Sequence, residues 1–336
     1  MCIRDSNGVE ILNSFPECEK DQNQIELETG DGGTTNRFLM PLLARGKKNY
    51  QMNMAAPMRM RPMDDLVEPL SKMGVRIDKN NRGYMIRGPY LNPGRYIIDC
   101  SKSTQFASGL LMGVSGLEKF KVEATNIQYS EKYFKITEDL IEEFKTTKNF
   151  IVPVDASSLG YAIAAGLTLK TVRVPDCLRV DKLQADSAIF DIIEDIGGSY
   201  SFDSGCLEVN FSDQLTAFSV DCGDFPDLVP TLAYLASYAK GTTILSNLEV
   251  LTHKESDRFF EIKKQLRQIG IKFQEEKFSL IINGTKEKKK PFSYHAPDDH
   301  RMIMTTALHM MKNSGGVISN WKHVKKSFPN FFKEFN

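Results

Sequence analysis

The chain has 336 residues, of which 41% are hydrophobic, so it can fill more than one core, and a fully disordered polypeptide is excluded. Its 43 basic and 43 acidic residues cancel, which gives no reason to expect nucleic acid or an anionic membrane as a partner. No apolar run approaches the roughly 20 residues that cross a bilayer, and the six cysteines form no CxxC pair, as is typical of reduced thiols. We therefore expect a soluble, cytoplasmic protein in which any affinity for anions is local.

One pattern of elements recurs along the chain: a buried, apolar helix followed by a β-rich run. The five copies are 34–54, 104–122, 157–174, 230–248 and 300–319. Their helices are rich in Leu, Ala and Met nearly all round, which indicates burial. Most copies begin about 70 residues apart, and this spacing predicts tandem α/β units.

A second pattern interleaves with the first: an amphipathic helix, a glycine, and then an alternating strand. It occupies 66–78, 188–202 and 261–273. The glycines of this pattern stand where a helix end requires positive φ, which glycine adopts without steric cost. They are Gly74, Gly197 and Gly270. A break near 150–153 predicts a first domain of 1–152 and a second domain of 153–336.

The first half of the chain offers three candidate anion contacts. The Gly-rich turn 30–37, GDGGTTNR, lets backbone N–H groups approach an anion, although an ordinary tight turn is an equal alternative. It has no Walker lysine, so nucleotide binding is not expected. Arg59 and Arg61 lie in a proline-bounded loop, and a guanidinium suits carboxylate or phosphate. The segment 101–105, SKSTQ, places hydroxyls at a helix start, where a simple N-cap is the alternative.

The second half holds a charged hexapeptide, 253–258, HKESDR. Helical spacing sets Lys254 and Arg258 on one face with Glu255 adjacent, so a cationic pocket could hold one carboxylate as an acid or base. The alternative is a solvated first turn of a helix. Asp227 precedes an apolar helix and is a candidate either for its N-cap or for a base in a cleft.

Among the five histidines, His300 is the best placed for function. It lies between Asp299 and Arg301 at a predicted helix start, where free N–H groups favour anions. The spacing of the histidines matches no HxxxH or HExxH metal motif, so a metal site is not expected.

Nine segments, taken in order, resemble the family of 5-enolpyruvylshikimate-3-phosphate (EPSP) synthase, the 3-phosphoshikimate 1-carboxyvinyltransferase. They are GDGGTTNR, RPMDDLVEPLSKMGV, SKSTQF, SEKYFKIT, DASS, FPDLVPTLA, HKESDR, DDHRM and KKSFP. The resemblance implies an α/β fold, a two-domain inside-out α/β barrel with three βαβαββ units per domain, and domains that close over the substrates. Six copies are implied and five are counted. Since the family's Lys-Ser motif and its following Arg have no match in 1–29, we expect an N-terminally truncated chain in which the first unit is missing.

The resemblance also implies the substrates and their contacts. Shikimate 3-phosphate is expected at Ser103, Thr104, Gln105, Ser130, Tyr133, Asp227 and Lys254. Phosphoenolpyruvate is expected at Gly33, Arg61, Gln105, Arg258, Arg301 and Lys326, with His300 nearby. The 5-hydroxyl would attack C2 of phosphoenolpyruvate, Asp227 would accept the hydroxyl proton and Glu255 would protonate the methylene carbon. No metal or organic cofactor is implied, and a monomer is expected.

Two alternatives remain open at this point. The related carboxyvinyl transferase that acts on UDP-N-acetylglucosamine typically uses a cysteine in a mobile loop, and the corresponding stretch 53–62 has none. The other alternative is a catalytically incompetent fragment of the shikimate enzyme, because the Lys-Ser-Arg group of the first unit is not found in the chain.

Overall fold

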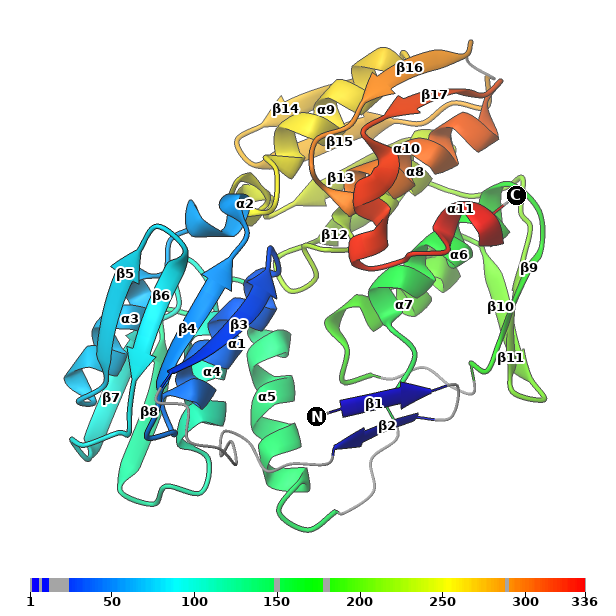
Figure 1. The fold of residues 1–336 in the computed structure, drawn as a ribbon. Helices are drawn as coiled ribbons and strands as arrows, with labels where there is room; N and C mark the ends of the chain where they lie inside the picture. The colour runs from blue at the N-terminus through cyan, green and yellow to red at the C-terminus, as the bar shows by residue number, and fades with distance from the viewer. Residues whose placement is uncertain are drawn as a thin grey trace. The chain divides into compact units, whose positions relative to one another are not determined.

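The computed structural model describes residues 2–5, 8–11, 24–147, 152–177, 182–287 and 290–335, with side chains from residue 24 onward. The chain divides into two compact units, Met1–Asn149 and Phe150–Asn336 (Figure 1). Each unit is an α/β assembly with its own helices and sheets.

The elements of the two units follow in chain order. Unit 1 contains β1 (Cys2–Asp5), β2 (Gly8–Ile11), β3 (Gln24–Gly30), α1 (Gly33–Leu43), β4 (Asn49–Met54), α2 (Ala56–Arg59), α3 (Asp64–Lys72), β5 (Arg76–Asn80), β6 (Gly83–Arg87), β7 (Gly94–Asp99), α4 (Gln105–Val114), β8 (Phe120–Thr125) and α5 (Glu131–Glu143). Unit 2 contains α6 (Ala156–Thr168), β9 (Val172–Pro175), η1 (Ala185–Ser187), α7 (Ala188–Asp195), β10 (Ser199–Asp203), β11 (Cys206–Asn210), β12 (Ser219–Asp221), α8 (Val229–Tyr238), β13 (Thr242–Ser246), η2 (Glu249–His253), α9 (Arg258–Gln268), β14 (Lys272–Glu276), β15 (Ser279–Asn283), β16 (Phe292–His295), α10 (His300–Lys312), β17 (Gly316–Ser319), η3 (Trp321–Lys326) and α11 (Phe331–Glu334).

The predicted βαβαββ unit is confirmed once in each half of the chain. The orders β3-α1-β4-α3-β5-β6 and β12-α8-β13-α9-β14-β15 match, apart from a short helix inserted in each, α2 and η2. In both sheets the first two strands are parallel and a hairpin adds two antiparallel strands, giving β3-β4-β6-β5 and β12-β13-β15-β14. Parts of the same order recur in β7-α4-β8-α5, α6-β9-α7-β10-β11 and β16-α10-β17.

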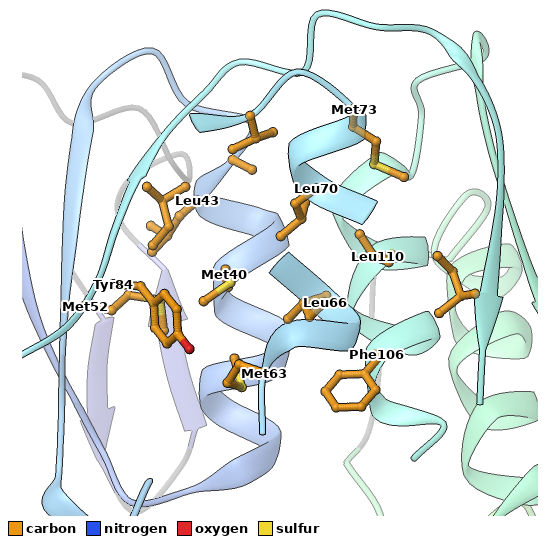
Figure 2. Close-up of a cluster of buried hydrophobic side chains, with 14 of the residues drawn as sticks. Met40, Leu43, Met52, Met63, Leu66, Leu70, Met73, Tyr84, Phe106 and Leu110 are labelled. Atoms are coloured by element: carbon orange, nitrogen blue, oxygen red, sulfur yellow. The ribbon is translucent and has the colours of Figure 1, made fainter. Parts of the chain in front are cut away.

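The first helix of each repeat lies in the core, because it has apolar residues on every side. Every residue of α8 is buried, and α8 packs against both α6 and α10 in unit 2. In unit 1, Met40 of α1 lies in one cluster with Leu66 and Leu70 of α3 and with Phe106 and Leu110 of α4 (Figure 2). The predicted burial of these helices is confirmed.

The glycine stops of the second pattern are also confirmed. Gly74 has φ +88°, Gly197 +79° and Gly270 +69°, each two residues after the last residue of its helix. A side chain at these positions would be strained. These helices therefore end where the sequence indicates, and each is followed closely by the first strand of a hairpin.

Three further features concern the described residues alone. None of their helices is both long and apolar enough to cross a membrane. They contain no group of three or more His, Cys, Asp or Glu side chains arranged to hold a metal ion. Cys100, Cys177 and Cys222 are buried free thiols, and Cys206 is a partly buried one.

A histidine lies in the middle of the helical core of unit 2. His309 of α10 is 1% exposed, and its Nδ1 lies 2.9 Å from the hydroxyl of Tyr238 on α8. The ring also packs edge-on against Tyr234 at 4.9 Å between centroids. Burial lowers the pKa of His309 to about 3, so the imidazole is neutral at physiological pH.

Replacing His309 with glutamine is expected to flatten the pH dependence of unfolding between about pH 4 and 6. The unfolded chain protonates this histidine below about pH 6.5 while the folded chain does not, so the free energy of unfolding falls by about 1.4 kcal/mol per pH unit as the pH drops. Denaturant unfolding at several pH values, followed by fluorescence of the single tryptophan, Trp321, measures the slope. The exposed His295→Gln is the control. An unchanged slope in the His309 variant would contradict a neutral buried histidine.

Candidate active site

Cations and carboxylates gather at the N-terminal ends of α8, α9 and α10 and at the end of η3 in unit 2. We call this group the unit 2 ion cluster. Its members are Asp227, Lys254, Glu255, Arg258, Asp299, Arg301 and Lys326. When all are ionised the cluster holds four cations and three carboxylates, which leaves one net positive charge. An excess of cations at helix N-termini favours an anionic ligand.

Arg258 is the centre of the cluster. Its side chain is 1% exposed, and its three nitrogens each reach a different carboxylate. Nε donates to Asp299 at 2.7 Å, Nη1 to Asp227 at 2.8 Å and Nη2 to Glu255 at 2.5 Å. Such charge-assisted hydrogen bonds offset the free-energy cost of removing the guanidinium from water. The alternative of a solvated, charged first turn is therefore wrong for Arg258.

Asp227 joins three of the cations. Besides Arg258, its carboxylate accepts a hydrogen bond from Arg301 Nη2 at 3.0 Å and lies 3.4 Å from Lys254 Nζ. It does not cap α8, whose N-cap is Leu228 and lacks a side-chain cap hydrogen bond. The N-cap interpretation of Asp227 is therefore wrong, and its carboxylate belongs to the ion cluster.

Lys254 reaches the cluster by a different route from the one the spacing predicts. It lies in extended backbone after η2, and Asp257 is the N-cap of α9, with its side chain accepting from Phe260 N at 2.9 Å. Lys254 and Arg258 therefore do not share one face of a helix, and that prediction is wrong. They converge because both reach Asp227.

The cations keep the carboxylates of the cluster ionised. Burial by itself would raise the pKa of Glu255, but the charges of Arg258 and Lys326 outweigh it and hold that pKa well below its usual range. Burial is likewise outweighed at Asp227, where Arg301, Lys254 and Arg258 lower the pKa. Both groups are thus ionised, and able to accept a proton, at neutral pH.

His300 begins α10, as predicted, directly after the N-cap Asp299. The Asp299 carboxylate accepts from Arg301 N at 3.0 Å. His300 is 5% exposed, and burial together with the charge of Arg301 lowers its pKa to about 4. Among the described residues, its Nδ1 has no hydrogen-bond partner. At neutral pH His300 is a neutral imidazole beside the cations.

A second polar group lies in unit 1, around the buried Arg37. Its guanidinium is 4.5 Å from the ring centroid of Phe106 and donates to Gln105 Oε1 at 2.9 Å and to Ser103 Oγ at 3.4 Å. Gln105 Nε2 in turn donates to Thr34 Oγ1 at 2.9 Å. Arg37 thus links the Gly-rich turn to the segment 101–105. Arg37 is not among the predicted site residues, although a buried arginine directly before the apolar run 38–43 is a signal of a specific role.

The Gly-rich turn is built as a helix entrance. Gly30 has φ +65°, Gly32 is the N-cap and α1 begins at Gly33. A methyl group added to Gly33 would overlap the guanidinium of Arg61, so only glycine lets this arginine lie against the first turn of α1. Arg61 follows α2, a one-turn helix within the segment predicted to be a loop.

The remaining predicted residues of unit 1 lie near the starts of α4 and α5. Ser103 Oγ accepts from Gln105 N at 3.3 Å, and Thr104, the N-cap of α4, makes no side-chain cap hydrogen bond. Thr104 Oγ1 instead donates to Ser130 O at 3.4 Å. Ser130 has φ +62° and precedes α5, which carries Tyr133. These contacts bring the segments 101–105 and 130–133 together.

Comparison with known proteins gives one consistent result. The sequence model described as EPSP synthase (3-phosphoshikimate 1-carboxyvinyltransferase) matches residues 3–335. A protein named 3-phosphoshikimate 1-carboxyvinyltransferase from Thermococcus kodakarensis is 32% identical over 322 residues, covering 90% of this chain and 78% of the relative. A protein of the same name from Pyrococcus abyssi is 31% identical over 324 residues, covering 91% of this chain and 77% of the relative.

Solved structures agree with the sequence comparison. EPSP synthase from Acinetobacter baumannii has a TM-score of 0.71 at 20% identity, covering 91% of this chain and 77% of that one. The enolpyruvyl transferase NikO from Streptomyces tendae has a TM-score of 0.65 at 14% identity, covering 89% and 75% of the two chains. At these identities the likeness establishes the fold alone. Because the family match extends over almost the entire sequence and the repeated βαβαββ units are present, the chain belongs to the EPSP synthase family.

Proposed function

We propose that the chain transfers the enolpyruvyl group of phosphoenolpyruvate to the 5-hydroxyl of shikimate 3-phosphate and releases phosphate. The observation that carries this proposal is the unit 2 ion cluster, which combines four cations with ionised carboxylates at three helix N-termini. Both substrates are multiply charged anions, and the reaction also requires a proton acceptor. Family membership supplies the identity of the substrates.

The proposed contacts of each substrate follow the family pattern. Shikimate 3-phosphate is assigned to Ser103, Thr104, Gln105, Ser130, Tyr133, Asp227 and Lys254. Phosphoenolpyruvate is assigned to Gly33, Arg61, Gln105, Arg258, Arg301 and Lys326, with His300 nearby. Three sets of contacts support this assignment. Gly33 lies beside Arg61, and Gln105 lies beside Ser103 and Thr34. Asp227, Lys254, Arg258, Arg301 and Lys326 all belong to the unit 2 ion cluster. A monomer, a cytoplasmic location and the domain ranges 1–152 and 153–336 remain part of the proposal.

Asp227 is proposed as the base that takes the proton of the 5-hydroxyl. It is ionised because of the cations around it, as a base must be before the reaction begins. When a substrate anion binds Arg301, the hydrogen bond from Arg301 to Asp227 is exchanged for one to the ligand. Asp227 then loses a stabilising charge, its pKa rises, and it becomes a stronger acceptor for the hydroxyl proton.

Glu255 is proposed as the group that protonates the methylene carbon of phosphoenolpyruvate. Glu255 is ionised in the structure, because Arg258 donates to it at 2.5 Å and Lys326 lies 3.4 Å away. Anionic substrates compete for these two cations, so their arrival raises the pKa of Glu255 and lets it gain a proton. After donation, the same carboxylate can take a proton back from the methyl carbon as phosphate leaves the adduct.

The activity is tested by phosphate release from the purified chain with both substrates together and with each alone. Release that requires both substrates is expected. A folded chain that binds both without releasing phosphate would instead support the alternative of a catalytically incompetent fragment. Calorimetry in two buffers of different ionisation enthalpy tests the protonation step, because binding of both substrates should be accompanied by net proton uptake.

Replacing Gly33 with alanine is expected to raise the KM for phosphoenolpyruvate roughly tenfold, since one displaced charge-assisted hydrogen bond contributes about 1.5–3 kcal/mol. The added methyl group displaces the guanidinium of Arg61, which is the flexible end of a side chain, so stability should change by less than about 1 kcal/mol. Steady-state kinetics measures the effect. Gly94→Ala is the matched control, because its methyl group meets only ordinary contacts. An unaltered KM for phosphoenolpyruvate in the Gly33 variant would show that Arg61 does not contact this substrate.

A further inference from the structure

A buried tyrosine that the proposed mechanism does not use lies behind the unit 2 ion cluster. Tyr161 of α6 is 1% exposed, and its ring packs edge-on against Phe331 of α11 at 6.1 Å between centroids. The charged groups that act on its hydroxyl are Arg301, Arg258 and Asp299. The ring therefore packs against an aromatic side chain, while the hydroxyl lies within electrostatic range of three members of the cluster.

The hydroxyl of Tyr161 is buried and makes no well-formed hydrogen bond among the described residues, although the Arg301 side chain is near enough to act on it. A second fully buried tyrosine, Tyr234 of α8, is paired, since its Oη lies 2.6 Å from Thr168 Oγ1 of α6. Burial raises the pKa of Tyr161 to about 12 although Arg301 and Arg258 oppose the rise, so the phenol stays neutral. A buried polar group without a partner lowers stability and calls for an explanation.

Arg301 offers that explanation. Its Nη2 donates to the Asp227 carboxylate at 3.0 Å and its Nη1 to the Asp227 backbone oxygen at 3.3 Å. To bind an anion, the guanidinium has to leave the Asp227 carboxylate. A neutral hydroxyl oxygen can accept a hydrogen bond from a guanidinium without cancelling its charge, which a carboxylate would do.

We propose that Tyr161 is a positioning residue for Arg301, whose guanidinium donates to the Tyr161 hydroxyl when it turns from Asp227 to the phosphoenolpyruvate anion. This inference rests on the proposed function, which places that anion at Arg301. In the structure Arg301 is already close enough to act on this hydroxyl, but the two groups make no well-formed hydrogen bond. In the complex that hydrogen bond is complete. It therefore favours the bound state over the free state, and it acts on the affinity for one substrate rather than on the proton transfers.

The test compares Tyr161→Phe with Tyr234→Phe. Each variant loses one buried hydroxyl and keeps its ring, but only Tyr234 loses a well-formed hydrogen bond that the structure shows. For Tyr161→Phe we expect the KM for phosphoenolpyruvate to rise tenfold or more, as is typical for a lost hydrogen bond to a charged group (roughly 10- to 150-fold). Its kcat and its KM for shikimate 3-phosphate should stay within about twofold, since ground-state and transition-state binding are weakened equally.

The unfolding temperature without ligands is the second measurement. Tyr161→Phe should unfold at the wild-type temperature or a few degrees higher, whereas Tyr234→Phe should unfold about 2–4 °C lower and keep the wild-type KM. An unchanged KM for phosphoenolpyruvate in Tyr161→Phe overturns the inference, and so does an equal rise for both substrates, which indicates a structural disturbance.

Calorimetric titration of wild type and variant with phosphoenolpyruvate, in the presence of shikimate 3-phosphate, separates this inference from the proposed function. A wild-type chain that binds phosphoenolpyruvate while Tyr161→Phe binds it equally well overturns only the role of Tyr161. A wild-type chain that neither turns over nor binds phosphoenolpyruvate overturns the proposed function and the inference with it. Weaker binding by the variant alone supports the inference, whether or not the wild type turns over.

Discussion

Replacing Arg258 with methionine is expected to lower the free energy of unfolding at neutral pH by about 3–5 kcal/mol, the range for removing one partner of a buried ion pair. The guanidinium is 1% exposed and holds three carboxylates, of which Asp299 is 0% exposed. Methionine fills much of the same space but donates no hydrogen bond, so Asp299 would be left as a buried charge without its guanidinium. The loss should thus come mainly from uncompensated charge rather than from a cavity.

The pH dependence of this loss follows from the carboxylates. In the wild type, burial would raise the pKa of Asp299, but the charge of Arg258 outweighs burial and lowers it. The ionised Asp299 therefore stabilises the folded state at pH values above the pKa of Asp299 in the unfolded chain, and this contribution is lost as the pH falls. Without Arg258, burial dominates and the pKa of Asp299 rises above its unfolded value. Protonation of Asp299 then removes the uncompensated buried charge from the variant. The difference in free energy of unfolding between variant and wild type should therefore shrink from neutral pH to about pH 4.

Urea unfolding at two pH values, followed by the fluorescence of Trp321, reports on this effect within unit 2. Arg267→Met is the matched control, because Arg267 is an exposed arginine on the same helix, 5.3 Å from the ring of Phe273. That control should lose about 1 kcal/mol or less. Equal losses in the two variants would show that Arg258 is not the centre of a buried charge network.

Replacing Glu255 with glutamine is expected to reduce phosphate release by about 10²–10⁴-fold while both substrates still bind. Glutamine has nearly the same shape and its carbonyl oxygen can still accept from Arg258, which now donates to Glu255 at 2.5 Å. It cannot carry a proton to the methylene carbon. Since the variant also removes one negative charge from the cluster, the affinity for the two anions should be kept or increased.

Phosphate release and calorimetric binding on the same samples separate chemistry from affinity for the Glu255 variant. Glu276→Gln, an exposed residue of β14, is the control and should keep wild-type turnover. If Glu255→Gln retained full turnover, the proton would have to come from another group. A weakened affinity with normal kcat would instead assign Glu255 to substrate binding.

The sequence by itself determined the repeated architecture of this chain. The apolar helices, such as α8 in 230–248, and the glycine stops at Gly74, Gly197 and Gly270 depend on local periodicity and on the backbone freedom of single residues. Such properties depend only on residues that are close together in the sequence. The family resemblance and the choice of Arg258, Arg301 and Glu255 as site candidates came from motifs that are equally local.

Only the tertiary structure decided how these residues meet. Asp227 contacts Arg258, 31 positions away, and Arg301, 74 positions away, whereas Lys254 and Arg258 do not share the helical face that their spacing predicts. The burial of Arg258 and the position of Tyr161 behind the cluster likewise could not be predicted. The physical reason is that helix and strand periods govern contacts within a few residues, while the pairing of distant charges is fixed by how α6, α8, α9 and α10 pack together.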